Sequence, residues 1–154
     1  MPRIEWQWKR FAELEPQALY ALLAARAAVF VVEQHCAFLD LDGLDACAWH
    51  LLGWAATEDG PALAAYLRLI DPGRKYAEPS IGRVLTTAPF RGTGAGRAAM
   101  AEALARAAAV YPGRAIRIGA QQRLERFYAE FGFRTVSPPY REDGIAHVEM
   151  LSTP

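Results

Sequence analysis

The sequence contains little cysteine and carries no excess of either charge. Its two cysteines, Cys36 and Cys47, lack a C-x-x-C spacing and a companion histidine pattern of the zinc type, so neither a disulfide nor a metal site is expected. Lysine and arginine together number 17, and aspartate and glutamate also number 17. Because no net charge attracts a polyanion, we expect neither nucleic acid nor an anionic membrane as a partner.

Long apolar runs are also missing. No segment approaches the roughly 18 consecutive apolar residues that a membrane-spanning helix requires. The opening residues, Met1-Pro2-Arg3-Ile4-Glu5-Trp6-Gln7, do not resemble a secretory signal, since no apolar stretch follows a basic start. These absences predict a soluble, cytoplasmic protein.

The sequence does contain enough apolar residues for one core. A chain of 154 residues, of which 53% are hydrophobic, matches a single ordinary domain, which we expect over residues 1–154. Alternating apolar residues and short apolar segments next to turn signals predict strands, and apolar spacings of three and four predict helices. The predicted strands are 4–9, 50–55, 63–70, 80–87, 115–120, 133–136 and 145–151, and the predicted helices are 16–32, 96–110 and 122–131. This order predicts an α/β fold in which a mixed, mostly antiparallel central sheet carries helices on both faces.

The segment from Cys36 to Asp45 is polar and acidic, which predicts a loop. Its aspartates Asp40, Asp42 and Asp45 resemble part of a calcium-binding loop. The third acidic ligand before the glycine and the closing glutamate are missing, however. We therefore interpret this segment as a solvated loop that faces a cationic substrate.

Gly92, Gly94 and Gly96 occupy every second position between a predicted strand and a long predicted helix. Glycine lets the backbone turn its amides toward one point, and a helix N-terminus adds partial positive charge there. Such a turn suits a diphosphate. The spacing is neither the G-x-x-x-x-G-K-S/T of nucleoside triphosphatases nor the dinucleotide fingerprint. A plain tight connection is the alternative interpretation.

The block Val84–Arg97 resembles the coenzyme A motif of the Gcn5-related N-acetyltransferase (GNAT) superfamily. It includes the signature Arg/Gln-x-x-Gly-x-Gly/Ala at Arg91, Gly94 and Gly96. A second motif, Ala120–Phe133, follows at the distance that the superfamily leads one to expect. The match of both motifs, in order, implies the GNAT fold.

Within the superfamily the chain is similar to the ElaA-like group, and the resemblance extends over nearly its whole length. The segments that carry it are Val29–Gln34, Asp40–Gly43, Ala65–Arg68 and Glu142–Met150.

The resemblance implies that acetyl-coenzyme A binds as a co-substrate. The backbone of Val84, Leu85 and Thr86 would hold the pantetheine arm, and Gln121 stands where many relatives have a cofactor-contacting asparagine. Tyr128 would lie beside the thioester sulfur and donate a proton to the leaving thiolate. The turn that would hold the pyrophosphate comprises Arg91, Gly92, Thr93, Gly94, Ala95, Gly96 and Arg97.

The implied function is an acetyl-coenzyme A-dependent N-acetyltransferase that acts on a primary amine of a small molecule or a protein. The amine attacks the thioester directly, so neither an acyl-enzyme nor a metal is required. Two alternatives stay open: a coenzyme A-binding sensor or interaction module without catalysis, and an acyltransferase with a longer acyl donor. A homodimer is also expected, because the sheets of this superfamily often leave an edge strand exposed.

Several residues are candidates for binding or deprotonating the amine. Glu33 directly follows the first predicted helix, in a segment that borders the acceptor site in relatives. His147 and Glu149 lie two apart on the last predicted strand and so share a face. His50, among apolar residues, is more typical of a core histidine, and water is the remaining candidate. We keep Glu33 and His147 as catalytic candidates beside Tyr128.

Overall fold

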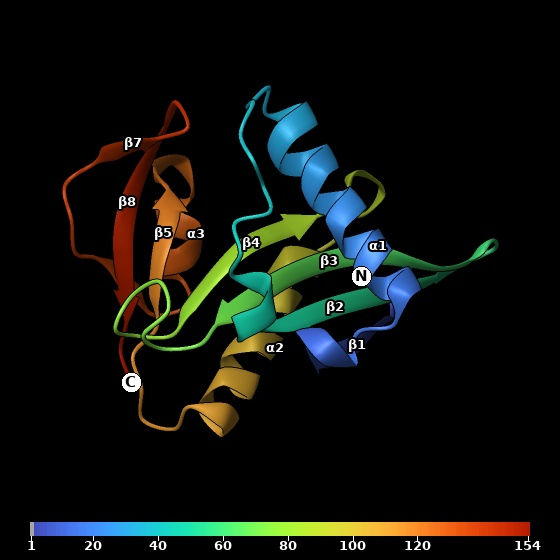
Figure 1. The fold of residues 1–154 in the computed structure, drawn as a ribbon, viewed down its shortest axis with the longest axis horizontal. Helices are drawn as coiled ribbons and strands as arrows, with labels where there is room; N and C mark the ends of the chain where they lie inside the picture. The colour runs from blue at the N-terminus through green and yellow to red at the C-terminus, as the bar shows by residue number, and fades with distance from the viewer. Residues whose placement is uncertain (1) are drawn as a thin grey trace.

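The strands form two antiparallel sheets rather than the single predicted sheet (Figure 1). A computed structural model describes residues 2–154, so that only Met1 of the predicted domain lies outside it. The first sheet has the order β1 (Ile4–Arg10), β2 (Ala48–Thr57), β3 (Gly60–Ile70) and β4 (Ser80–Thr86). The second has the order β5 (Arg117–Gln121), β8 (Ile145–Ser152) and β6 (Phe133–Thr135), and β7 (Tyr140–Glu142) also pairs with β8. The predicted antiparallel character is confirmed.

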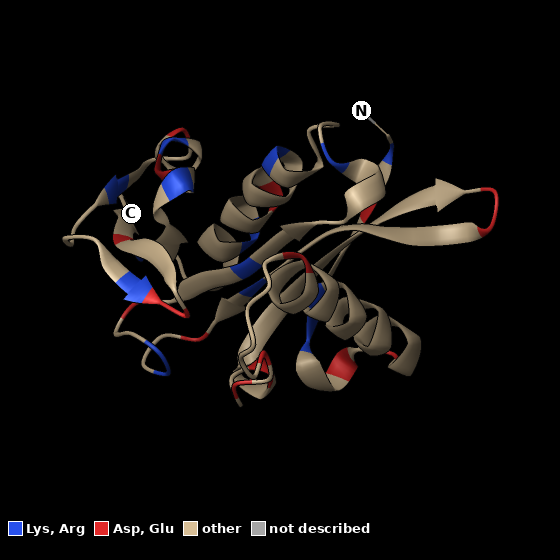
Figure 2. Ribbon diagram, turned by 90° about the horizontal axis from the view of Figure 1, so that it is seen from above, with Lys and Arg blue, Asp and Glu red and all other residues tan. Residues whose placement is uncertain are grey.

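Helices cover both faces of the first sheet, as predicted (Figures 1 and 2). α1 (Pro16–Arg26) continues into a π-helical segment, η2 (Ala27–Glu33), on one face, and α2 (Ala95–Val110) lies on the opposite face. α3 (Glu125–Ala129) packs against β5 and β6. The remaining helical turns are the 3-10 segments η1 (Phe11–Glu13), η3 (Asp45–Cys47), η4 (Ala88–Phe90) and η5 (Gln122–Leu124).

β3 is the central strand of the core, because it is buried on both faces. Leu67 and Leu69 belong to the cluster that packs under α2, whereas Tyr66 belongs to the cluster under α1. A strand covered on both sides has no solvent face. This explains why residues 63–70, apart from Arg68, are apolar without alternation.

A β-bulge in β4 helps to separate the two sheets. Tyr66 pairs with Leu85 and Arg68 pairs with Gly82, so Arg83 and Val84 together oppose the single residue Leu67. Arg83 has a φ of +52°, in the left-handed region that non-glycine residues rarely adopt. A bulge bends its strand and increases its twist. We infer that this bend turns β4 away from the second sheet.

β4 and β5 lie side by side only where they begin. A hydrogen bond from the amide of Arg117 to the carbonyl oxygen of Pro79 (3.0 Å) joins them there. Beyond that bond β4 is the edge strand of its own sheet. The result is a V-shaped opening between β4 and β5.

Two elements differ from the sequence prediction. β7 was not predicted, although Asp143 and Gly144, with φ values of +50° and +77°, form the kind of turn that Asp-Gly favours in a hairpin. The predicted helix 122–131 begins as the 3-10 turn η5, and its α-helical part ends at Ala129.

The helix from Pro16 to Glu33 is long and apolar enough, by length and composition alone, to cross a membrane. In this fold it packs on β3 and β4, and its residues Leu22 and Arg26 are fully buried. Its packing therefore makes it a helix of the folded domain.

Candidate functional site

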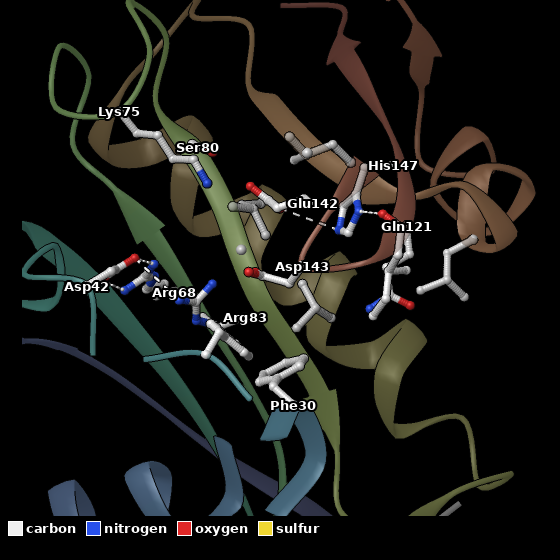
Figure 3. Close-up of a pocket in the computed structure, with 18 of the residues that line it drawn as sticks. Phe30, Asp42, Arg68, Lys75, Ser80, Arg83, Gln121, Glu142, Asp143 and His147 are labelled. Carbon is white, nitrogen blue, oxygen red and sulfur yellow. Dashed lines mark hydrogen bonds and ion pairs between the residues drawn. The ribbon is translucent and has the colours of Figure 1, made fainter. Parts of the chain in front are cut away.

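A cavity of about 320 Å³ occupies the opening between the two sheets (Figure 3). β4 forms one wall, and β5 and β8 form the other. Two contacts bridge its mouth: the Gln121 side chain donates to Gln34 Oε1 (3.3 Å), and Cys36 Sγ donates to the carbonyl oxygen of Asp143 (3.2 Å). These contacts join the segment after η2 to β5 and to the β7–β8 hairpin.

The structure brings four of the predicted site residues to this cavity: Val84, Gln121, Tyr128 and His147 all line it. Leu85 is instead buried in the core under α1, as the alternation of side chains along a strand requires. The predicted role of the Val84–Thr86 backbone is not affected, because it does not depend on side chains.

The glycine turn leads into α2 beside the end of β4. Gly94 is the residue before the helix and has a φ of +90°, and Gly92 has a φ of +75°. The first hydrogen bond into the helix runs from the amide of Ala98 to the carbonyl oxygen of Gly94 (3.0 Å). The amides of residues 95–97 therefore have no acceptor within the helix, so they are available to an anion.

Two side-chain hydrogen bonds and the close packing of Gly96 on Thr86 hold this turn in place. Arg91 Nε donates to the carbonyl oxygen of Thr86 (3.1 Å), and Thr93 Oγ1 donates to that of Phe90 (2.5 Å). A Cβ atom at Gly96 would lie only 3.1 Å from Thr86 Oγ1, so glycine allows α2 to approach β4. Arg97 is ion-paired with Glu130 on the surface. The free amides and the left-handed glycines fit a diphosphate.

Tyr128 extends from α3 to the wall of the cavity. Its side chain is buried, with 7% exposed, and makes edge-on contacts with Phe127 and Phe133. Burial raises the pKa of Tyr128 to about 12. Its hydroxyl is therefore protonated at neutral pH and able to donate.

His147 is placed so that one ring nitrogen is fixed and the other is free to accept a proton. Nδ1 lies 2.8 Å from the carbonyl oxygen of Ile145, which can only accept, so Nδ1 carries the proton of the neutral ring. Nε2 lies 3.5 Å from Glu142 Oε2 on β7. The Tyr140 ring stacks on the imidazole, with centroids 5.9 Å apart.

The other candidate bases lie outside the cavity lining. Glu33 is ion-paired with Arg91 (2.7 Å), and Glu149 with Arg117 (3.2 Å). His50 is buried between the Tyr66 hydroxyl (2.7 Å) and the carbonyl oxygen of Asp45 (2.9 Å), and burial lowers its pKa. His50 is thus a hydrogen-bonded core histidine.

The interpretation of the acidic segment as a solvated, substrate-facing loop is wrong. Asp40, Asp42 and Asp45 are ion-paired with three arginines, Arg26, Arg68 and Arg83, at distances from 2.5 to 3.4 Å. Arg26 and Arg68 are fully buried, so their charges require carboxylate partners. These pairs join the segment to α1 through Arg26 and to the first sheet through Arg68 and Arg83.

The ion pairs predict an acid-sensitive stability. Burial raises the pKa of Asp42, but the hydrogen bonds and charge of Arg68 outweigh it, so the pKa lies well below the ordinary 3.8. A lowered pKa stabilises the fold at pH values above about 3.8, and that stabilisation is lost as pH falls through the lower folded value. We expect Asp42→Asn to lower the free energy of unfolding by about 1–3 kcal/mol at pH 7. The substitution should also reduce the loss of unfolding free energy that the wild type shows below about pH 4. Denaturant titration measures both effects.

Asp59→Asn is the matched control, since Asp59 lies in the exposed β2–β3 turn. Equal effects of the two substitutions on unfolding would contradict the structural role of the Asp42 pairs.

A family description, "Acetyltransferase (GNAT) domain", matches residues 49–153, and the fold, the glycine turn and the cavity agree with it. The chain belongs to the GNAT acetyltransferase family. Within it the chain is 40% identical to protein ElaA of Escherichia coli, over 96% of this chain and 95% of that one. It is 47% identical to a UPF0039 protein of Synechocystis, over 96% and 94% of the two chains.

Solved structures agree with this assignment. An acyl-CoA N-acyltransferase from Pseudomonas aeruginosa superimposes with a TM-score of 0.91 at 38% identity, covering 98% of this chain and all of that one (100%). The Escherichia coli ElaA structure gives a TM-score of 0.88 at 39% identity, covering 97% and 99%. The predicted fold and the resemblance to the ElaA-like group are confirmed.

Several residues of the site were not identified from the sequence. Arg68 interrupts an otherwise apolar strand, and such a lone charge is a signal that a buried partner is needed. Glu142 and Lys75, which both line the cavity, gave no comparable signal, because each lies in a short exposed segment.

Proposed function

We propose that the protein is an acetyl-coenzyme A-dependent N-acetyltransferase that acetylates a primary amine without an acyl-enzyme. The observation that carries the proposal is that Tyr128 and His147, a proton donor and a proton acceptor, line one cavity at the edge of β4. A cavity of about 320 Å³ must receive the reacting ends of both substrates, which favours a short acyl group.

In this proposal, backbone groups bind the pyrophosphate and the pantetheine arm of acetyl-coenzyme A. The amides from Gly92 to Arg97 would hold the pyrophosphate, and the backbone of Val84–Thr86 would hold the pantetheine arm beside the bulge. Gln121 lines the cavity and would contact the donor there. Acetyl-coenzyme A, when bound, supplies an acetyl group activated as a thioester.

His147 is the general base in this proposal. An amine attacks only when it is neutral, and His147 Nε2 is a free acceptor in the cavity that can take its proton. The Glu142 carboxylate, 3.5 Å away, would stabilise the protonated imidazole. Tyr128 would donate to the leaving sulfur.

The function is tested with a panel of amines and peptides supplied with acetyl-coenzyme A, scored by release of free thiol. We expect turnover on at least one amine, with a matching mass increase of one acetyl group in the product. Tight coenzyme A binding without turnover on any acceptor would favour a coenzyme A-binding sensor. Turnover only with longer acyl donors would favour an acyltransferase that uses a longer acyl-coenzyme A.

Two substitutions distinguish His147 from Glu33 as the base. We expect His147→Asn to lower the rate by about 10²-fold, at the lower end of the general-base range, because positioning supplies much of the acceleration. The pH profile of the rate should differ between the wild type and His147→Asn, because the general base contributes to that profile. Coenzyme A affinity should not change.

Glu33→Gln is the matched variant, and it should retain the wild-type pH profile. A normal profile in His147→Asn with an altered one in Glu33→Gln would assign the base to Glu33. Unchanged profiles in both variants would leave water as the proton acceptor.

A further inference from the structure

Some charged side chains on the cavity wall are paired with opposite charges, and others are not (Figure 3). Arg68 and Arg83 line the cavity, but together with Arg26 they are balanced by the three aspartates of the loop. Three positive charges thus meet three negative charges. This network contributes no net charge toward a substrate.

Lys75, on the connection between β3 and β4, is a different case. It lines the cavity, and it forms no ion pair or hydrogen bond with any residue from 2 to 154; its ammonium group contacts the Tyr76 ring, whose centroid lies 5.6 Å from Nζ. Its ammonium group points toward the cavity rather than away from it (Figure 3). An unpaired ammonium group on a cavity wall is suited to an anionic ligand.

Ser80, at the start of β4, provides a second unused donor. Ser80 is 3% exposed and lines the same cavity. Its hydroxyl makes no hydrogen bond with the described part of the chain. A hydroxyl that opens onto a cavity and has no protein partner can donate to a ligand atom there. A carboxylate accepts from a hydroxyl and an ammonium group at the same time.

The β7–β8 hairpin brings groups of the opposite sign. Glu142 and Asp143 both line the cavity, and Asp143 has no ion pair among residues 2–154. With His147, these carboxylates provide a site for an ammonium group that must be bound and then deprotonated. The cavity therefore has an anion-binding side and a cation-binding side.

From this arrangement we propose that the acceptor is a small free amino acid. Its ammonium group would lie against Glu142 and His147, and its carboxylate would be bound by Lys75 and Ser80. The inference rests on the proposed acetyltransferase function and specifies its substrate class. Phe30, Phe38, Leu39 and Ile145 supply apolar wall for an aliphatic side chain.

Free amino acids and their primary amides provide a direct test. We expect leucine, methionine or glutamine to be acetylated with a kcat/KM roughly 10- to 100-fold above that of its amide, the effect of one charge-assisted hydrogen bond. The amine of an amide loses its proton more readily than that of the free acid. Amine basicity therefore works against this preference and cannot produce it.

Lys75→Met should remove the preference by raising KM for the free amino acid, while kcat and the reaction of the amide stay unchanged. Lys75→Arg should retain most of it. Arg74→Met is the control, because Arg74 is an exposed neighbour that does not line the cavity. The proposal would be overturned if amides reacted as well as free amino acids. It would also be overturned if Lys75→Met lowered kcat/KM equally for the free amino acid and for its amide.

A binding measurement separates this inference from the proposed function. Calorimetry of leucine with the coenzyme A-loaded protein should give affinity that falls at least tenfold in Lys75→Met, whether or not acetyl transfer occurs. Failure of all acceptors to turn over would remove the acetyltransferase proposal. Failure of every free amino acid in the panel to bind more tightly than its amide would remove the substrate class.

Discussion

Replacing Tyr128 with phenylalanine is expected to slow acyl transfer by roughly 10²–10⁴-fold, the usual loss when a general acid is removed. The ring would keep its contacts with Phe127 and Phe133, whose centroids lie 5.2 and 6.1 Å from its own. Only the hydroxyl on the cavity wall is lost. Coenzyme A affinity, measured by calorimetry, and the Tm should therefore stay near the wild-type values.

The acidity of Tyr128 refines its proposed role. Its pKa is raised by burial to about 12, whereas an ordinary thiol has a pKa of about 8.5. The phenol is too weak an acid to transfer its proton fully to a thiolate of ordinary basicity. A hydrogen bond that strengthens as negative charge develops on sulfur is the contribution we expect. Because the phenol stays protonated, Tyr128 should impose no loss of rate up to about pH 10.

Tyr20→Phe is the control for this substitution, since Tyr20 is exposed on α1. Wild-type turnover in Tyr128→Phe would show that the residue serves only in core packing. A reduced Tm in parallel with the reduced rate would instead indicate that the hydroxyl supports the fold.

Local sequence patterns predicted most of the fold because they depend on neighbouring residues. The alternation in β1, the spacing in α2 and the glycine turn each report a backbone conformation that a short segment adopts by itself. The pair Glu102–Arg106, four residues apart on α2 and 2.9 Å from each other, is another contact set by local spacing. The division into two sheets could not be predicted so, because it depends on how β4 and β5 meet across 30 residues of intervening chain.

The acidic loop illustrates the limit for the site. Asp42 and its partner Arg68 are 26 residues apart, and nothing near either residue identifies the other. An aspartate in a Gly-containing loop is most often solvated, so the local interpretation failed where a long-range pair replaced the solvent. Tyr128 and His147 were both candidates from the sequence, and the fold brings both to one cavity.

Glu33 was a candidate for the acceptor site because it follows the first predicted helix. The geometry of that helix changes before it reaches Glu33. η2 has the wider turn of a π-helix, and the hydrogen bond from the amide of Cys36 to the carbonyl oxygen of Val31 (3.0 Å) spans five residues. Counting by 3.6 residues per turn therefore no longer gives the direction of a side chain. In the structure the Glu33 carboxylate pairs with Arg91, the first residue of the glycine turn, and Glu33 does not line the cavity.

Replacing Gly94 with valine is expected to weaken coenzyme A binding by at least about 100-fold, or about 2.7 kcal/mol. Gly94 adopts a φ of +90° and directly precedes the free amides of residues 95–97. A β-branched residue disfavours that conformation and would place a side chain where the pyrophosphate must approach. Loss of several charge-assisted hydrogen bonds from amides to phosphate accounts for an effect of this size.

Gly113→Val separates loss of the site from backbone strain. Gly113 also has a positive φ, +72°, and a Cβ there would meet nothing within 4 Å, but it lies beyond the other end of α2. Both substitutions should therefore lower the Tm by similar amounts, since a left-handed conformation costs an L-residue about 1–2 kcal/mol. Only Gly94→Val should lose affinity for coenzyme A in calorimetry. If the two variants bind coenzyme A equally well, the diphosphate is held elsewhere, and the assignment of the glycine turn is wrong.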